Sequence, residues 1–145
     1  MSDLAPWMMW ERCFFALVLW REARGESREC KIAVACSIWQ RAKTPSWWGK
    51  SLIDVLKKKW QYSSVTDPND RQLTTWPDES DHLFEECLEI ACNVVDGKIK
   101  SAIVGADSYF DDSLKGDMIP RWAKEHPERF VGKVGPMNFY RMHGA

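Results

Sequence analysis

Apolar and polar positions along this chain follow a spacing that predicts mainly helices. A first helix is expected over residues 6–23, because apolar side chains recur there every three or four positions. Pro6 suits the first helical turn, and Gly25 suits the stop just past the end. The recurring apolar positions, which we expect to face the core, are Met9, Trp10, Cys13, Phe14, Leu17 and Trp20.

A second helix is expected over about residues 28–41, with Ser27 as its N-cap. Apolar side chains surround this segment almost completely, so we expect it to be the buried centre of a helical bundle. Ser51 is expected to cap a short third helix that carries Lys57–Lys59 at its end. A long fourth helix is expected over residues 79–96.

The remaining segments predict little β-structure. Residues 60–66 alternate polar and apolar side chains, which favours one small hairpin, and residues 67–70 form a turn. Residues 103–140 are irregular apart from a short helix at 120–123, and their aromatic side chains are suited to building a groove. We therefore expect one domain over residues 1–145, mainly α in class, with at most a small β-hairpin.

The composition narrows the classes of function. Of the 145 residues, 45% are hydrophobic and 28% are charged, as in ordinary globular domains. With 20 Lys and Arg against 21 Asp and Glu, the net charge is −1, which argues against a nucleic-acid partner. The apolar run at residues 13–20 is too short to span a bilayer, and the N-terminus lacks the basic region of a secretory signal. Nine Trp exceed what so small a core readily buries, so several are expected in a groove.

Cysteine and histidine spacing predicts no cofactor. The five cysteines lie among apolar residues and form no C-x-x-C pair, which favours buried, reduced thiols and folding in a reducing compartment. The three histidines are scattered, so the spacing indicates no zinc site. We therefore expect neither a metal nor another cofactor.

The residue with the most interesting chemical setting is Glu22, in the polar segment 21–26 that follows the apolar first helix. A carboxyl group half in an apolar wall loses solvation and can hold a proton near neutral pH. A general acid for glycosidic bonds needs this property. Alternatively, Glu22 and Glu26 pair with neighbouring arginines on a solvated helix end, which the local sequence alone favours.

A second carboxylate is not apparent from the spacing. Glycosidases that use two carboxylates hold them roughly 5 to 9.5 Å apart. Glu26 is near Glu22 in sequence, but the intervening Gly25 leaves their geometry open. The other candidates, which share only a place in the later loop, are Asp107, Asp111 and Asp112.

Several short motifs, in order and at compatible spacing, resemble the SleB-type cell wall hydrolase family of spore-cortex-lytic enzymes and phage endolysins. The resemblance covers about residues 13–141. The motifs are E-A-R-G-E at 22–26, A-V-A at 33–35, Gln40-Arg41, Q-Y-S at 61–63, Gly105-Ala106 with Tyr109-Phe110, P-R-W-A at 120–123, and Gly135 with F-Y-R at 139–141. The resemblance implies a lysozyme-like, transglycosylase-type α+β fold and makes Glu22 the catalytic acid.

The chain departs from the family pattern at four positions. Arg21 stands where a small residue is frequent, and Gln40 stands where Asn is frequent. Ser108 and Met137 stand where His is common, which argues against a histidine-assisted role. The chemistry expected of Glu22 does not depend on these four residues.

The resemblance also implies a reaction, cleavage of the β-1,4 bond between N-acetylmuramic acid and N-acetylglucosamine. Glu22 would protonate the leaving oxygen. Without a second carboxylate, the C6 hydroxyl of the muramic acid would then attack, which gives a 1,6-anhydro sugar. Attack by water, as in a muramidase, is the close variant.

Other residues are expected to support this reaction. Glu26 and Tyr109 are candidates for assisting the acid, and one member of the Trp47-Trp48 loop pair is a candidate for reaching the glycan. The candidates for binding substrate, each with packing or hairpin structure as the alternative, are Trp60, Gln61, Ser63, Trp122 and Tyr140.

The expected function is that of a phage endolysin, a monomer that acts on peptidoglycan glycan strands and does not insert stably into membranes. It would wait folded in the host cytoplasm until a holin opens the membrane, and then reach the periplasm and cell wall. The alternatives are a hydrolytic muramidase and a non-catalytic peptidoglycan-binding or phage structural protein. An amidase would need zinc ligands or a Cys-His pair, and neither is apparent by spacing.

Overall fold

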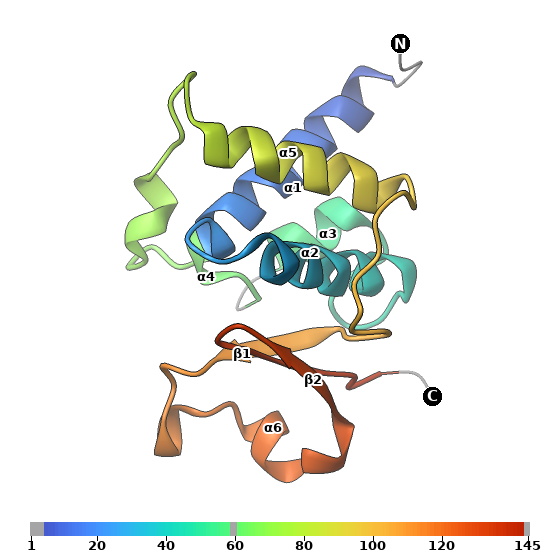
Figure 1. The fold of residues 1–145 in the computed structure, drawn as a ribbon, viewed down its shortest axis with the longest axis vertical. Helices are drawn as coiled ribbons and strands as arrows, with labels where there is room; N and C mark the ends of the chain where they lie inside the picture. The colour runs from blue at the N-terminus through green and yellow to red at the C-terminus, as the bar shows by residue number, and fades with distance from the viewer. Residues whose placement is uncertain (1–4, 59–60, 144–145) are drawn as a thin grey trace.

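The computed structural model describes residues 5–58 and 61–143 (Figure 1). The described chain is mainly helical and has a small antiparallel sheet near its C-terminal end, so the expected fold class is confirmed. The α-helices are α1 (Pro6–Ala23), α2 (Arg28–Lys43), α3 (Leu52–Lys57), α4 (Ser63–Thr66), α5 (His82–Val95) and α6 (Arg121–Glu125). The strands are β1 (Ser108–Asp111), β2 (Phe130–Val134) and β3 (Met137–Tyr140).

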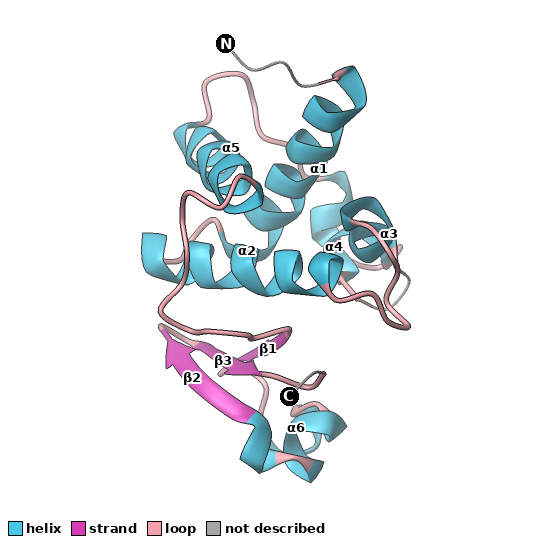
Figure 2. Ribbon diagram, turned by 90° about the vertical axis from the view of Figure 1, so that its right-hand side faces the viewer, coloured by secondary structure: helices cyan, strands magenta, loops and turns pink. Residues whose placement is uncertain are grey.

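Helix α2 occupies the centre of the molecule, as its composition predicts. Helices α1 and α5 pack on one side of it, and the sheet covers the other side (Figure 2). Val34, Ala35 and Ile38 of α2 are fully buried. Ser27 caps the helix, because its side chain accepts the backbone N–H of Cys30 at 3.2 Å.

Two ion pairs with buried cations connect α5 to the other long helices. Arg12 of α1 lies 2.8 Å from Asp96, just past the end of α5, and Lys31 of α2 lies 2.5 Å from Glu86. Removing one partner of such a pair would leave a buried charge uncompensated. These contacts therefore fix how α1, α2 and α5 lie against one another.

The ends of the shorter helices follow their caps. Ser51 caps α3, as expected, by accepting the N–H of Asp54 at 3.2 Å. Helix α5 begins at His82, later than expected, because Asp81 accepts the N–H of Phe84 at 2.9 Å and so sets the start. Within residues 5–58 and 61–143, no helix combines the length and the apolar composition that crossing a bilayer demands.

The sheet differs from the hairpin predicted at residues 60–66. Residues 63–66 form the single turn α4, and the strands come from later segments expected to be irregular. The strand order is β1-β3-β2, with Tyr109 opposite Phe139. Gly135 has φ of +55°, in the region that favours glycine, and makes the turn between β2 and β3. These strands are short, so contacts with α2 rather than local alternation select them.

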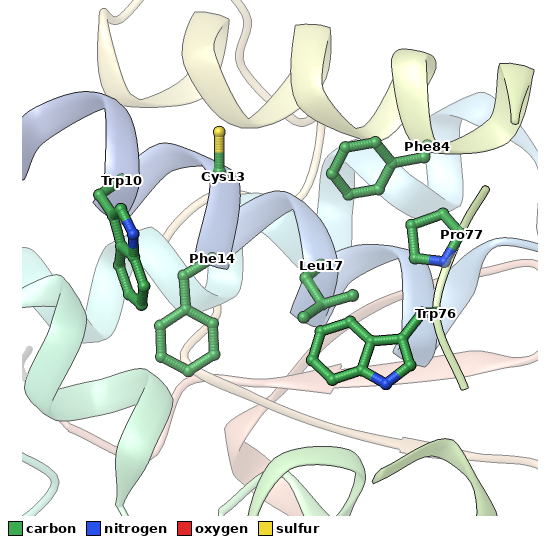
Figure 3. Close-up of a pocket in the computed structure, with 7 residues that line it drawn as sticks. All are labelled: Trp10, Cys13, Phe14, Leu17, Trp76, Pro77 and Phe84. Carbon is green, nitrogen blue, oxygen red and sulfur yellow. The ribbon is translucent and has the colours of Figure 1, made fainter. Parts of the chain in front are cut away.

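The face of α1 that enters the core also differs from the prediction. Phe15, Val18 and Leu19 are fully buried, whereas Trp10 is 70% exposed. Because α1 is apolar on most sides, the periodicity of its sequence does not single out one face. Of the expected core positions, Trp20 is buried as predicted, whereas Trp10, Cys13, Phe14 and Leu17 help to form an open apolar groove of about 390 Å³ (Figure 3). Its lining residues are Trp10, Cys13, Phe14, Leu17, Trp76, Pro77 and Phe84.

The cysteines are free, as predicted, but they are not all buried. Cys30 and Cys87 are buried, and burial raises their thiol pKa values to about 11 and about 12, so both are inert at neutral pH. Cys13 is exposed, because it lies on the outward face of α1. The expectation of five buried thiols is therefore wrong at Cys13, and Cys36 and Cys92 are only half-buried.

Candidate active site

Glu22 lies in the last turn of α1, where this helix meets α4 (Figure 1). Its side chain is half-buried. Strand β1 brings Tyr109 to the same place, and the Tyr109 hydroxyl donates a hydrogen bond to Oε1 of Glu22 at 2.9 Å. Two of the residues singled out in the sequence, 87 positions apart, therefore meet directly.

The surroundings of Glu22 favour its protonated form. Burial raises the pKa of the Glu22 carboxyl above its usual range, which is the largest effect. The hydroxyls of Tyr109 and Ser64 oppose this shift, and the negative charge of Asp70 adds to it. Ser64 Oγ is buried and has no hydrogen bond of good geometry to other described residues, so it remains available to the Glu22 carboxyl. A carboxyl group in this setting can deliver a proton near neutral pH.

The two tyrosines near Glu22 keep their protons. Burial raises the pKa of Tyr109 well above its usual value, and the neighbouring charge of Glu22 raises it further. Burial likewise raises the pKa of Tyr62 to about 12. Tyr109 therefore remains a hydrogen-bond donor to Glu22 at neutral pH and does not compete with it as an acid.

Arg21 connects the end of α1 to residues 64–75, which lie next to Glu22 in the site. Its buried guanidinium donates to the backbone carbonyls of Ser64 at 3.0 Å, Leu73 at 3.2 Å and Thr75 at 3.1 Å. It also lies 4.5 Å from the ring centroid of Trp76. This contact set explains an arginine where a small residue is frequent in the family, and the sequence alone does not indicate it.

Arg41 holds the strand that carries Tyr109. Its guanidinium donates to the carbonyl oxygen of Asp107 and to the Ser108 hydroxyl, at 3.1 Å in the latter case. It also lies 4.9 Å from the ring centroid of Trp48. Because Asp107 and Ser108 directly precede Tyr109, Arg41 fixes the position from which Tyr109 reaches Glu22.

The sequence profile of one family, described as cell wall hydrolase, matches residues 25–140. The chain belongs to the cell wall hydrolase family. The matched region begins three residues after Glu22, so the role of Glu22 depends on the geometry around it rather than on the match.

Two solved structures share the fold of this cell wall hydrolase. The catalytic domain of the germination-specific lytic transglycosylase SleB from Bacillus anthracis superposes with a TM-score of 0.69 at 18% identity, over 97% of this chain and 98% of that chain. The catalytic domain of the Bacillus cereus SleB protein gives 0.67 at 20% identity, over 90% of this chain and 88% of that chain. At these identities the likeness shows the fold. Among curated proteins, no sequence matches the chain.

The acids expected as a second carboxylate have other contacts. Asp107 is buried and accepts the N–H groups of Met142 at 2.8 Å and His143 at 2.9 Å, so it anchors the C-terminal segment. Asp111 accepts the N–H of Ser113 at 2.6 Å.

Asp112 and Glu26 also lie in other surroundings. Asp112 pairs with Lys133 and accepts from Asn138 at 2.8 Å. Glu26 lies beside Cys30 near Gly135, in the turn between β2 and β3. Within the described chain, the acid whose charge raises the pKa of Glu22 is instead Asp70.

The sequence did not single out Asp70, because its place in a predicted turn indicates no more than a local structural role. It lies in the predicted turn at 67–70 and caps the 3-10 turn at Arg71–Thr74 by accepting the N–H of Gln72 at 2.8 Å. Its other carboxylate oxygen accepts the Ser63 hydroxyl at 2.7 Å. A capping aspartate in a turn is usually structural, and only the folded chain brings it near Glu22.

Two of the predicted substrate-binding residues line one open pocket. Gln61 and Trp122 border it together with Trp47 and His143, and its volume is about 390 Å³. Arg41 also lines this pocket, and its guanidinium lies 6.0 Å from the ring centroid of Tyr62. Glu22 is not among the residues that line the pocket.

The other predicted binding residues have different settings. Ser63 is exposed beside Asp70, whereas Tyr140 is packed among the rings of Phe110, Trp122 and Phe130, which favours the packing alternative for it. Trp60 lies outside the described residues.

The Trp47-Trp48 pair behaves as expected for adjacent loop tryptophans, with one side chain out and one in. Trp47 is 56% exposed and Trp48 is buried. For metal binding, the described residues contain no group of three or more His, Cys, Asp or Glu side chains suited to hold an ion.

Proposed function

We propose that this chain degrades peptidoglycan by cleaving the β-1,4 bond between N-acetylmuramic acid and N-acetylglucosamine, with Glu22 as the catalytic acid. The observation that carries the proposal is the half-buried Glu22 carboxyl, with its raised pKa and its 2.9 Å hydrogen bond from Tyr109. The fold shared with SleB catalytic domains, one of them titled a lytic transglycosylase, supports the assignment.

In the first step, Glu22 transfers its proton to the glycosidic oxygen as the bond from that oxygen to the anomeric carbon breaks. The sugar takes on oxocarbenium character, and Glu22 becomes a carboxylate. Tyr109 already donates to Oε1, so the developing charge meets a preformed donor. Because Oε1 accepts this hydrogen bond, we assign Oε2 as the oxygen that carries the transferred proton.

In the second step, the Glu22 carboxylate accepts the proton of the muramic acid C6 hydroxyl. The oxygen of that hydroxyl bonds to the anomeric carbon, which yields a 1,6-anhydro sugar. One carboxyl group thus serves both as acid and as base, and no water is consumed. In the hydrolytic alternative, water takes the place of the C6 hydroxyl and leaves a reducing end, and the charge of Asp70 near Glu22 is the observation that favours it.

The residues proposed to bind the glycan are Gln61, Ser63, Trp122 and Trp47. Gln61, Trp122 and Trp47 line one pocket, and an exposed indole such as Trp47 offers a flat face to a sugar ring. Glu26 and Tyr140 have contacts that suit structural roles better.

Mass spectrometry of the fragments released from purified peptidoglycan tests the reaction. Fragments that end in 1,6-anhydromuramic acid are expected. Fragments that end in a reducing sugar would refute the intramolecular step and retain the glycosidase assignment. Intact peptidoglycan after incubation with folded protein would refute both and favour a binding protein.

We also propose that the chain serves as a phage endolysin, a monomer held in the host cytoplasm until a holin opens the membrane. Its five free cysteines are compatible with folding in a reducing compartment. Induced expression in a bacterial host provides the test. Lysis is expected only when a holin is expressed with the chain, and lysis by the chain alone would contradict this route.

A further inference from the structure

Asp70 is held rigidly at the wall that faces Glu22. One carboxylate oxygen accepts the N–H of Gln72 at 2.8 Å, and the other accepts the Ser63 hydroxyl at 2.7 Å. Asp70 is half-buried and forms no ion pair with another described residue. The side chain is therefore held in place by two hydrogen bonds, and the described residues give it no ion-pair partner within 4 Å.

The contacts of Arg21 bring this charge close to Glu22. Arg21 directly precedes Glu22 and donates to carbonyls at Ser64, Leu73 and Thr75, on both sides of Asp70 in the chain. Ser64 turns its buried hydroxyl toward Glu22, and the adjacent Ser63 bonds Asp70. Helix α4 thus links the two acids, because its Ser64 lies beside Glu22 and its Ser63 donates a hydrogen bond to Asp70.

The hydrogen bond from Ser63 to Asp70 also determines what Ser63 can offer a ligand. Its hydroxyl hydrogen is committed to Asp70, so the exposed Ser63 oxygen can only accept further hydrogen bonds. A sugar hydroxyl, an acetamido N–H or a water molecule would suit it. Ser63 and Asp70 are therefore placed to orient a donor group of a ligand close to the Asp70 carboxylate.

We propose that Asp70 is the second carboxylate of this site, which stabilises the positive charge that develops on the sugar and, through Ser63, orients a donor group of the bound glycan beside it. The proposal rests on the proposed function, since it concerns the same reaction. Asp70 acts through its field and through Ser63, so it is a positioning residue rather than a proton donor.

Few other titratable groups lie near enough to Glu22 to influence its pKa as Asp70 does. Within the described chain, the titratable groups that face Glu22 are Tyr109 from β1, Tyr62 from the residue before α4, and Asp70. Both tyrosines stay neutral because their pKa values are raised. The guanidinium of Arg21 donates to backbone carbonyls and lies close enough to Asp70 for the two opposite charges to attract each other. Removing the Asp70 charge should therefore lower the pKa of Glu22.

The test compares Asp70→Asn with Asp67→Asn. Asparagine can still cap the turn, so Asp70→Asn removes the charge and keeps the backbone bond to Gln72. Asp67→Asn is the matched control, because Asp67 caps the same loop by accepting the N–H of Asn69 at 2.9 Å and does not shift the pKa of Glu22. Thermal unfolding confirms that both variants fold, and Asp70→Ser offers a second capping residue without the charge.

Two readouts separate this proposal from the proposed function. Carbon-13 NMR of the labelled Glu22 carboxyl measures its pKa without any catalysis, and a fall of about half a unit to one unit is expected in Asp70→Asn. On peptidoglycan, kcat should fall about tenfold, with the alkaline limb of its pH profile shifted to lower pH. Asp67→Asn should match the wild type in both assays.

Unchanged titration of Glu22 in Asp70→Asn would overturn the proposal whether or not the chain is an enzyme. A lowered pKa with an unchanged kcat would overturn the role of Asp70 in catalysis. A wild-type chain that cuts no glycan would refute the proposed function instead, and the NMR titration would still decide whether Asp70 and Glu22 are coupled.

Discussion

Replacement of Tyr109 by Phe isolates the hydrogen bond on which Glu22 depends. The variant removes the hydroxyl that donates to Oε1 at 2.9 Å and keeps the ring, whose centroid lies 5.9 Å from that of Phe139. A hydrogen bond to a charged group contributes about 1.5–3 kcal/mol. The Tyr109 hydroxyl stabilises the charged form of Glu22, so its loss should raise the pKa of Glu22 further.

The same loss should slow the reaction. The carboxylate that forms as Glu22 gives up its proton would no longer meet a donor on Oε1, and about 1.4 kcal/mol of lost stabilisation corresponds to a tenfold lower rate. The assay is kcat/KM on purified peptidoglycan between pH 4 and 9. The expected result is a lower maximum, with the alkaline limb displaced to higher pH.

A Tyr109→Phe variant that folds and keeps both the wild-type maximum and the wild-type alkaline limb would refute this reasoning. A limb that moves to lower pH would also refute it, because the sign follows from which protonation state the hydroxyl stabilises. Tyr140→Phe is the matched control, since Tyr140 is packed among aromatic rings and does not contact Glu22. Its profile should match the wild type.

Three further predictions concern stability and binding. The pKa of Glu22 is raised on folding, so the contribution of this carboxyl group to stability is present at acidic pH and lost as the pH rises through the folded-state pKa. Glu22→Gln should therefore raise Tm relative to the wild type at pH 8 and leave Tm little changed at pH 4. Arg21→Met should lower the free energy of unfolding by about 3 kcal/mol in a urea titration, because one buried and two part-buried backbone carbonyls lose a charged donor. A loss below about 0.5 kcal/mol would contradict the role given to Arg21. Trp47→Ala should raise KM several-fold with kcat nearly unchanged, whereas Trp7→Ala, which removes a 63% exposed indole elsewhere, should leave KM unchanged; equal effects would contradict a glycan contact at Trp47.

Local signals in the sequence were sufficient for the longer helices but not for the single turn α4. The start of α2 depends on Ser27, whose side chain makes its capping bond within three residues, and Pro6 similarly begins α1. The inward face of α1 was mispredicted, because a helix apolar on most sides can turn either side to the core. Its buried side is chosen by contacts with α5 and α2, which are distant in sequence.

The residues of the site could be identified only in part from the sequence, because some of their roles arise only in the folded chain. Glu22 was identified from its apolar setting and a family motif, and Tyr109 from a motif in a later segment. Arg21 was not, because its carbonyl partners are distant in sequence, and Asp70 was not, because its own hydrogen bonds are those of an ordinary capping residue. The three-stranded sheet was missed for the same reason, since short strands such as β3 form only where partners and the helical core meet them.

The release of soluble glycan fragments from purified peptidoglycan by wild type, Glu22→Gln and Glu29→Gln tests the central assignment most directly. Glu29 is an exposed acid in the first turn of α2, so its variant controls for the loss of one negative charge. Wild type and Glu29→Gln should release fragments at equal rates, and Glu22→Gln should release them at least about a thousandfold more slowly. Fragment release by a folded Glu22→Gln variant at the wild-type rate would contradict the account.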